Sequence, residues 1–179
     1  MKKPHQFLKI MYLLQIIAVL CSTVMSSLNT VKADTKVGTD YGKQFITHAE
    51  LEDQDGKPKT EFSVYDTMQA EWDFKIPAGK AKAGDTMTVS VPSVFTLATD
   101  TSFDIKDPAG VVIGHAMANA QTHLLTVTLT DAVQNDHNAI TGRFKLWVKW
   151  DESKIEKDNT VDVDFGVGGS THVTVDPRW

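Results

Sequence analysis

Pairs of closely spaced carboxylates are the residues of this chain best suited to chemistry. Asp53 and Asp55 stand two positions apart in a polar segment, and Asp162 and Asp164 stand two positions apart in an alternating one. Such pairs can bind calcium or act as the acid and base of glycoside hydrolysis. Neither pair belongs to a full run of calcium ligands, and the solvent-facing side of a strand produces the second pair by itself. We therefore predict no catalytic residue and no metal ligand among them.

Histidine and serine offer no recognisable catalytic motif either. The histidines beyond residue 33 are His48, His115, His123, His137 and His172. They show neither HxH nor HExxH spacing, and no serine lies in a GxSxG elbow, so zinc chemistry and serine hydrolysis are not indicated. We interpret His115 as a candidate core histidine and place His137 in a polar loop. The expectation is a protein that is not an enzyme and has no cofactor.

A basic stripe with one tryptophan is the most distinctive polar feature. It consists of Arg143, Lys145, Trp147 and Lys149, which alternate with apolar residues along one segment. One interpretation, which we favour, is a cross-strand charge ladder against an acidic strand such as that of Glu71 and Asp73. The other is a ligand surface in which an outward-facing Trp147 is a binding hot spot.

Residues 1–33 have the pattern of a secretory signal rather than of a folded element. A basic start precedes a short apolar run, and the segment ends in Val31-Lys32-Ala33. This order is typical of a signal peptide, so we predict cleavage between Ala33 and Asp34. The run from Met11 to Cys21 is shorter than the roughly 20 residues of a membrane span. We therefore expect no membrane insertion after cleavage; an uncleaved anchor is the alternative.

Removal of this segment makes the chain strongly acidic. The formal net charge changes from −5 to −9, because residues 1–33 hold four lysines and no acid. Nucleic acid and anionic membranes require a concentrated basic surface, so neither is an expected partner. The only cysteine, Cys21, is lost with the same segment. A secreted domain without disulfides must rely on its core.

Alternating segments separated by turn residues predict an all-β fold. We expect strands over residues 45–51, 69–76, 87–91, 103–105, 111–117, 124–130, 143–150, 161–165 and 172–175. In the first of these, Phe45, Thr47, Ala49 and Leu51 are expected to share one face. No segment shows a convincing helical period, and eight or nine short strands predict an Ig-like sandwich. The predicted division is a signal (1–33), a polar lead (34–42) and one Ig-like domain (43–176).

The segment TVTLTDAVQ, residues 126–134, resembles the TYTFTDYVD motif of adhesive Ig-like domains in Gram-positive wall-anchored adhesins. The two agree at Thr126, Thr128, Thr130, Asp131 and Val133, and differ at Val127, Leu129, Ala132 and Gln134. The segments AGDTMTVSVP, FDIKDPAGVVIG and FKLWVKW are similar to the first adhesive domain of collagen and fibrinogen adhesins. The resemblance covers most of the chain beyond residue 33.

This resemblance implies an Ig-like β-sandwich of two antiparallel sheets, of the bacterial DE-variant type. Two neighbouring Ig-like domains of such adhesins close around an extended ligand, and the motif strand receives a latch strand from the next domain. The resemblance therefore implies a latch trench at an open sheet edge, lined by Thr126, Thr128, Thr130, Asp131 and Val133. It also suggests a Lys–Asn isopeptide bond, for which Lys43 and Asn159 are one possible pair. Residues 177–179 are expected to be a truncated linker to a following domain that the chain lacks.

Two functions from different classes follow from these observations. The first is a non-enzymatic surface adhesin domain that binds an extracellular protein of the collagen or fibrinogen class, together with an adjacent Ig-like domain. The second is a structural spacer or assembly domain without a ligand of its own. Both place the protein outside the cell, either secreted or at the cell wall of a Gram-positive bacterium.

Overall fold

A computed structural model of the chain describes residues 38–134, 137–156, 159–168 and 170–176. The strands are β1 (Ile46–Glu52), β2 (Glu61–Ser63), β3 (Met68–Ile76), β4 (Thr86–Ser90), β5 (Phe95–Thr96), β6 (Thr101–Lys106), β7 (Val112–Asn119), β8 (Leu124–Leu129), β9 (Ile140–Trp150), β10 (Asn159–Asp164) and β11 (Ser170–Asp176). One short 3-10 helix, η1 (Asp131–Gln134), follows β8. Within these ranges the chain is all-β, as predicted, and contains no helix that is long and apolar enough to cross a membrane. The predicted signal, its cleavage site and residues 177–179 lie outside the described residues.

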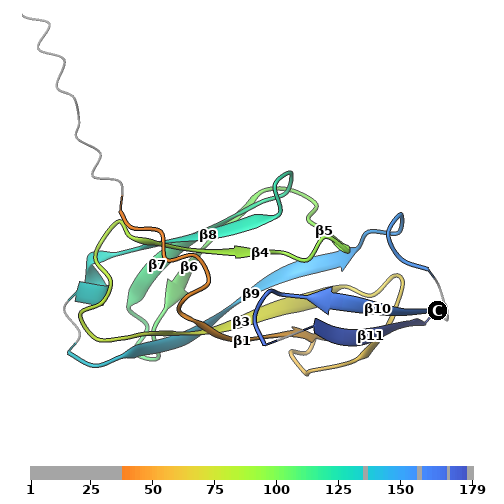
Figure 1. Ribbon diagram of the computed structural model, residues 1–179, viewed down its shortest axis with the longest axis horizontal. Helices are drawn as coiled ribbons and strands as arrows, with labels where there is room; N and C mark the ends of the chain where they lie inside the picture. The colour runs from red at the N-terminus through yellow and green to blue at the C-terminus, as the bar shows by residue number, and fades with distance from the viewer. Residues whose placement is uncertain (1–37, 135–136, 157–158, 169, 177–179) are drawn as a thin grey trace, which may run out of the picture. The chain divides into compact units, whose positions relative to one another are not determined.

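The strands form three hydrogen-bonded sheets (Figure 1). Their orders are β1-β3-β9-β5, β4-β8-β7-β6 and β10-β11-β2. All pairs are antiparallel except β11 with β2, which are parallel. Ahead of β1, residues 39–42 run beside β4: the Thr86 N–H donates to Thr39 C=O at 2.9 Å, and the Thr88 N–H donates to Gly42 C=O at 3.0 Å. This segment therefore covers the outer edge of β4.

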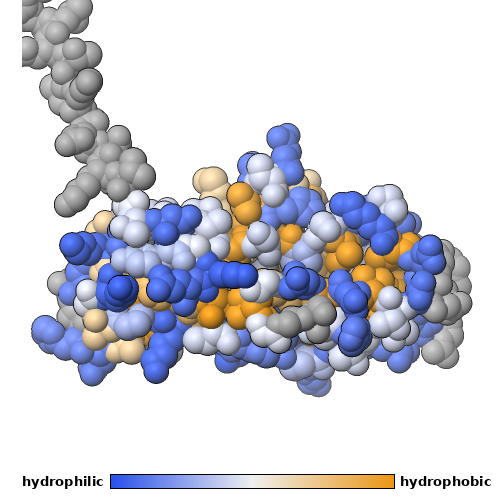
Figure 2. Space-filling view, in the orientation of Figure 1, coloured by the Kyte–Doolittle hydropathy of each residue, from blue (hydrophilic) through white to orange (hydrophobic). Residues whose placement is uncertain are grey.

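One continuous core lies between the sheets, and regular alternation explains it. On β3, Ala70, Trp72 and Phe74 are buried, because every second side chain of a strand points to the same face. Trp72 meets Phe165, just after β10, edge-on with ring centroids 5.6 Å apart. This contact joins the inner face of the first sheet to the sheet of β10 and β11. The space-filling view shows hydrophobic residues along the middle of the domain, with hydrophilic residues around them (Figure 2).

Two local irregularities overturn expected side-chain directions. A register shift between Ile46 and His48 inserts a bulge into β1, so Thr47 is exposed although Phe45, Ala49 and Leu51 are buried. The prediction that Thr47 shares their face is wrong, because an extra residue reverses the alternation on one side of the bulge. A second shift, between Ile105 and Lys106, lies in the β6–β7 hairpin.

The histidine on β7 illustrates the consequence of this second irregularity. His115 is exposed, whereas Ile113, Gly114 and Ala116 around it are buried. Its Nδ1 lies 2.7 Å from Asp104 Oδ1, on the residue directly opposite in β6. The interpretation of His115 as a core histidine is therefore wrong, and the side chain belongs to a surface pair.

Candidate functional site

The outer face of β3 and β9 carries a ladder of opposite charges. The register places Glu71 opposite Lys145 and Asp73 opposite Arg143. Arg143 Nη1 lies 3.1 Å from Glu71 Oε1, and Arg143 Nε lies 3.4 Å from Asp73 Oδ1. Lys145 Nζ lies 2.9 Å from Glu71 Oε2. The predicted cross-strand ladder is confirmed, because alternation on both antiparallel strands brings these side chains to one face.

Two carboxylates in this ladder are buried although they face outward. The side chain of Glu52 on β1 is 3% exposed and that of Glu71 on β3 is 2% exposed. Lys145 contacts a carboxylate oxygen of each, so one ammonium group links β1, β3 and β9. Desolvation lowers the pKa of Lys145, but hydrogen bonds to both carboxylates and their negative charges outweigh it, and the pKa is raised. The ammonium of Lys145 is therefore held between the carboxylates of Glu52 and Glu71.

The turn after β1 lies against this buried cluster. Asp53 Oδ1 accepts hydrogen bonds from the N–H groups of Asp55 and Lys57, at 2.9 and 3.0 Å. The hydrogen bond from Lys57 is the main reason that the pKa of Asp53 is lowered. Gly56 adopts a positive φ of 76°, and a Cβ there would lie 3.3 Å from Lys145 Nζ. Asp53 thus closes a tight turn that packs against the ammonium of Lys145.

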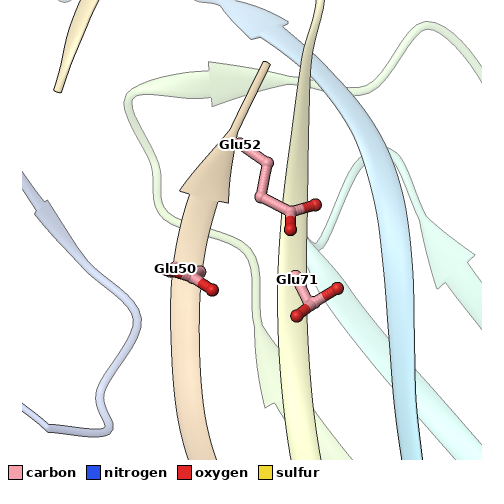
Figure 3. Close-up of side chains that lie close together, drawn as sticks. All are labelled: Glu50, Glu52 and Glu71. Carbon is pink, nitrogen blue, oxygen red and sulfur yellow. The ribbon is translucent and has the colours of Figure 1, made fainter. Parts of the chain in front are cut away.

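Three glutamates of this region converge in an arrangement that a metal ion could in principle use. Glu50, Glu52 and Glu71 each bring one oxygen to within 4.8 Å of the others (Figure 3). Hard cations such as Ca²⁺ prefer carboxylate oxygens. The ammonium of Lys145, however, already supplies positive charge to Glu52 and Glu71. We therefore describe the cluster as an internal ion network and assign it no metal.

The remaining half of the basic stripe is open to solvent. Trp147 is opposite Gln69 and 55% exposed, and Lys149 is opposite Thr96 and also exposed. In the part of the chain that the structure describes, Lys149 forms no ion pair. Arg143 and Lys145 of the predicted ligand surface form ion pairs with acids of their own sheet, although the Arg143 side chain is still 62% exposed, whereas Trp147 and Lys149 form none within the described residues.

The motif strand lies in the middle of its sheet. Thr126 and Thr128 of β8 point to the outer face, opposite Thr88 and Thr86 of β4, while Leu125, Val127 and Leu129 are buried. Thr130 Oγ1 donates to Val112 C=O at 2.8 Å and accepts from Ala132 N–H at 3.3 Å. Asp131 is exposed and opens η1, in which Val133 is buried. The predicted trench residues thus divide between an outer face, a turn and the core.

Neither edge of β8 is open. β4 pairs with it over Leu124 to Thr128, and β7 pairs with it over Leu124 to Leu129. Beyond Thr128, the Leu129 N–H donates to Asp85 C=O and the Thr130 N–H donates to Ile113 C=O. The expectation of an open edge at the motif is therefore wrong, because both neighbours already satisfy its main chain.

The suggested isopeptide pair is not brought together. Lys43 Nζ donates to Gly166 C=O at 2.5 Å, beyond the end of β10. The Asn159 amide donates to Glu156 at 3.1 Å, at the start of β10. Since each strand residue advances about 3.3 Å, the two side chains lie at opposite ends of this strand. The pairing of Lys43 with Asn159 is wrong.

Comparison with known proteins agrees with this architecture. A family model described as a bacterial Ig domain matches residues 61–161. Serine-aspartate repeat-containing protein E of Staphylococcus aureus strains MSSA476 and USA300 is 30% identical over 140 residues, which cover 73% of this chain and 12% of that protein. The chain therefore spans about one-eighth of the length of these curated relatives.

Solved structures of low sequence identity share the fold. The collagen binding domain of Erysipelothrix rhusiopathiae surface protein RspB superposes with a TM-score of 0.57 at 16% identity, over 76% of this chain and 47% of that one. Collagen adhesin from S. aureus gives a TM-score of 0.52 at 16% identity, over 78% and 45%. These matches confirm the predicted Ig-like fold, and the family match and the curated relatives confirm the resemblance to Ig-like domains of Gram-positive adhesins. The matched family is a non-enzymatic one, in agreement with the expectation that this domain is not an enzyme.

Proposed function

Because the chain belongs to the bacterial Ig domain family, we propose that it is a non-enzymatic adhesin domain that binds an extracellular protein. The observation that carries the proposal is the 30% identity to serine-aspartate repeat-containing protein E over 140 residues. Two proteins of the same fold are named for collagen. A ligand of the collagen or fibrinogen class, bound outside the cell of a Gram-positive bacterium, is the corresponding proposal for this chain.

The proposed ligand contact centres on Trp147. Its ring is 55% exposed in a region where Lys149 is also exposed. An exposed tryptophan offers a large contact area for little loss of side-chain entropy, which is typical of a binding hot spot. Arg143 and Lys145 support this surface indirectly, because their ion pairs hold β9 against β3.

We further propose that the domain works with a following Ig-like domain, which contributes a latch strand to β8. For this strand to pair with the β8 main chain, β4 or β7 must first separate from it. β4 is the more suitable of the two, because its other side pairs, among the described residues, with only the short segment 39–42, whereas β7 also pairs with β6 over six residues. Separation of β4 would free the main-chain groups of Leu125, Val127 and Leu129. The small side chains of Thr126 and Thr128 on the outer face would allow another backbone to approach closely.

A structural spacer is the alternative, and one observation favours it. Arg143 and Lys145 of the basic stripe form ion pairs with acids of their own sheet, and β8 has no free edge. A domain with these properties serves as a stable unit between other domains even if it contacts no ligand.

Solid-phase binding to collagen and fibrinogen tests the proposal. The chain would be joined to the Ig-like domain encoded downstream and compared with a Trp147→Ala variant. Met117→Ala is the matched control, because Met117 is 61% exposed on the other sheet. We expect saturable binding that Trp147→Ala weakens about tenfold or more and the control leaves unchanged. Binding to neither ligand, or a downstream gene without an Ig-like domain, would favour the spacer.

Export of the domain is a separate proposal with its own test. Signal cleavage after Ala33 is expected to give a secreted product that begins at Asp34. N-terminal sequencing of that product would read Asp34 first; residues preceding it would show that the cleavage position is wrong.

A further inference from the structure

The outer edge of β1 is only partly covered. β1 is the end strand of its sheet, and its last residues pair with the returning chain, where the Lys59 N–H donates to Leu51 C=O at 3.3 Å and the Asp53 N–H donates to Lys57 C=O at 2.9 Å. Backbone groups of alternate strand residues point to the same side. The N–H and C=O of Ala49 therefore point outward as those of Leu51 do. Among the described residues, no hydrogen bond reaches Ala49 from that side.

A groove of about 460 Å³ runs along this open part of the edge. One wall is β1 itself, over residues 48–51, and the other is formed by residues 58–61 and by Thr171 of β11. The groove exists because the chain leaves β1 after Lys59 and crosses to pair β2 with β11. Its volume is within the range of ligand-binding clefts in proteins. An unpaired strand edge can also pair with an added strand through its main-chain hydrogen-bonding groups.

The charges beside the groove select the kind of strand. On the outer face next to it lie Glu50, Glu52, Glu71 and Asp73; among the described residues, the permanent cations that form ion pairs with these four acids are Arg143 and Lys145. Glu50 stands directly opposite Glu71, a like-charge pair, and its own nearest basic group is His48 Nε2 at 3.7 Å. The Lys59 ammonium lies over the Phe62 ring and 3.8 Å from Asp66, and so neutralises a different acid. A cation beside Glu50 would reduce the excess of negative charge at this edge.

We propose that the β1 edge binds an extended, basic segment of a partner protein, which adds as an antiparallel strand and places a lysine or arginine beside Glu50. Antiparallel addition continues the order of this sheet, whose pairs are all antiparallel. The main chain of Ala49 supplies the central hydrogen bonds, and Glu50 supplies the charge preference. This site is separate from the surfaces around Trp147 and β8 and does not depend on them.

The probe is the acetylated and amidated pentapeptide KTVTV, whose first three residues are matched to the regular part of the edge from His48 to Glu50, beyond the bulge between Ile46 and His48. In an antiparallel strand its lysine lies opposite Glu50 and its first threonine opposite Ala49. The peptides ETVTV and VTVTK are controls, because the first reverses the charge and the second moves the lysine to the other end. A further pair carries an N-methyl group either on the first threonine, whose N–H faces Ala49, or on the central valine, whose N–H faces away.

Binding would be followed by amide NMR shifts of the isotope-labelled chain. We expect saturable shifts centred on Ala49 with KTVTV, at a Kd of about 1 mM or tighter. Both control peptides should bind about threefold more weakly or worse, from the loss of a cross-strand ion pair. N-methylation of the first threonine should abolish binding, and N-methylation of the valine should leave it unchanged. Glu50→Gln should remove the difference between KTVTV and ETVTV.

Three results would overturn the proposal. The first is the absence of shifts at Ala49 and Glu50 up to several millimolar peptide. The second is equal binding of the two N-methylated peptides, which would exclude strand addition. The third is a dimer in sedimentation that Ala49→Pro dissolves, which would assign this edge to a second copy of the chain. Ala49→Pro is suited to that test because the N–H it removes takes no part in the pairing with β3.

Discussion

Replacement of Lys145 by methionine tests whether the ion network stabilises the domain. Lys145 is the group that contacts Glu52, whereas Glu71 keeps Arg143 at 3.1 Å after the change. One buried carboxylate, 3% exposed, is therefore left without its partner. Removal of one member of a buried ion pair costs about 3–5 kcal/mol. Because the second carboxylate remains paired, we expect the lower end of this range, about 3 kcal/mol.

Urea unfolding followed by tryptophan fluorescence measures this loss directly. For a chain of this size, about 3 kcal/mol corresponds to a Tm lowered by roughly 6–12 °C and to a midpoint lowered by about 1 M urea or more. Lys149→Met is the matched control, since Lys149 is exposed on the same face of β9 and forms no ion pair within the described residues. It should change the free energy of unfolding by less than about 0.5 kcal/mol.

A second change separates lost charge pairing from lost packing. Glu52→Gln in the Lys145→Met background removes the unpaired negative charge, and should restore a large part of the stability because a neutral amide is cheaper to bury. If Lys145→Met and Lys149→Met destabilise equally, or if Glu52→Gln adds a further loss, then Glu52 does not depend on Lys145. Either result would refute the reasoning about the network.

Three further predictions concern the same fold. Because the pKa of Lys145 is raised, its contribution to the free energy of unfolding is complete below about pH 10.5 and is lost as the pH rises through the raised pKa. Urea titrations should show this alkaline loss of stability in the unchanged protein and not in the Lys145→Arg variant, since arginine keeps its charge. Asp85→Ala leaves the N–H groups of Thr39 and Lys82 without their acceptor, and calorimetry should show a loss of about 1–3 kcal/mol. Gly142→Ala places a Cβ 2.7 Å from the buried Phe74 ring and should cost about 1–3 kcal/mol, whereas no measurable loss would show that the ring can move aside.

The strands with unbroken alternation could be predicted from the sequence. Trp72 and Phe74 on β3 and Phe144 and Leu146 on β9 all face the core as their spacing indicates. The period of two depends only on backbone geometry, so it needs no knowledge of the neighbouring strand. The same alternation correctly indicated that acids of β3 would meet the bases of β9, since both strands expose every second residue.

Features that depend on register or on neighbouring strands could not be predicted. The bulge that exposes Thr47 and the shift that turns His115 outward have no signal in hydrophobic spacing. Glu52 is buried by Lys145 and by the turn at Gly56, which join it only after folding. The open edge expected at β8 failed for the same reason, because strand order in a sheet is a tertiary property that the motif does not encode.

A reversible lock between β4 and β8 tests the central claim most directly. The hydrogen bond from Leu129 N–H to Asp85 C=O makes these two residues a hydrogen-bonded pair. Because hydrogen-bonded and non-hydrogen-bonded pairs alternate along antiparallel strands, Thr88 and Thr126 form a non-hydrogen-bonded pair. The Cα atoms of such a pair lie about 4.5 Å apart, which is within the range that a disulfide can bridge. The Thr88→Cys/Thr126→Cys variant would be joined to the proposed following Ig-like domain and assayed on immobilised collagen and fibrinogen. We predict at least tenfold weaker binding when oxidised, and recovery on reduction. Equal binding in both states would contradict latching at β8, and no binding in either state would contradict the adhesin function.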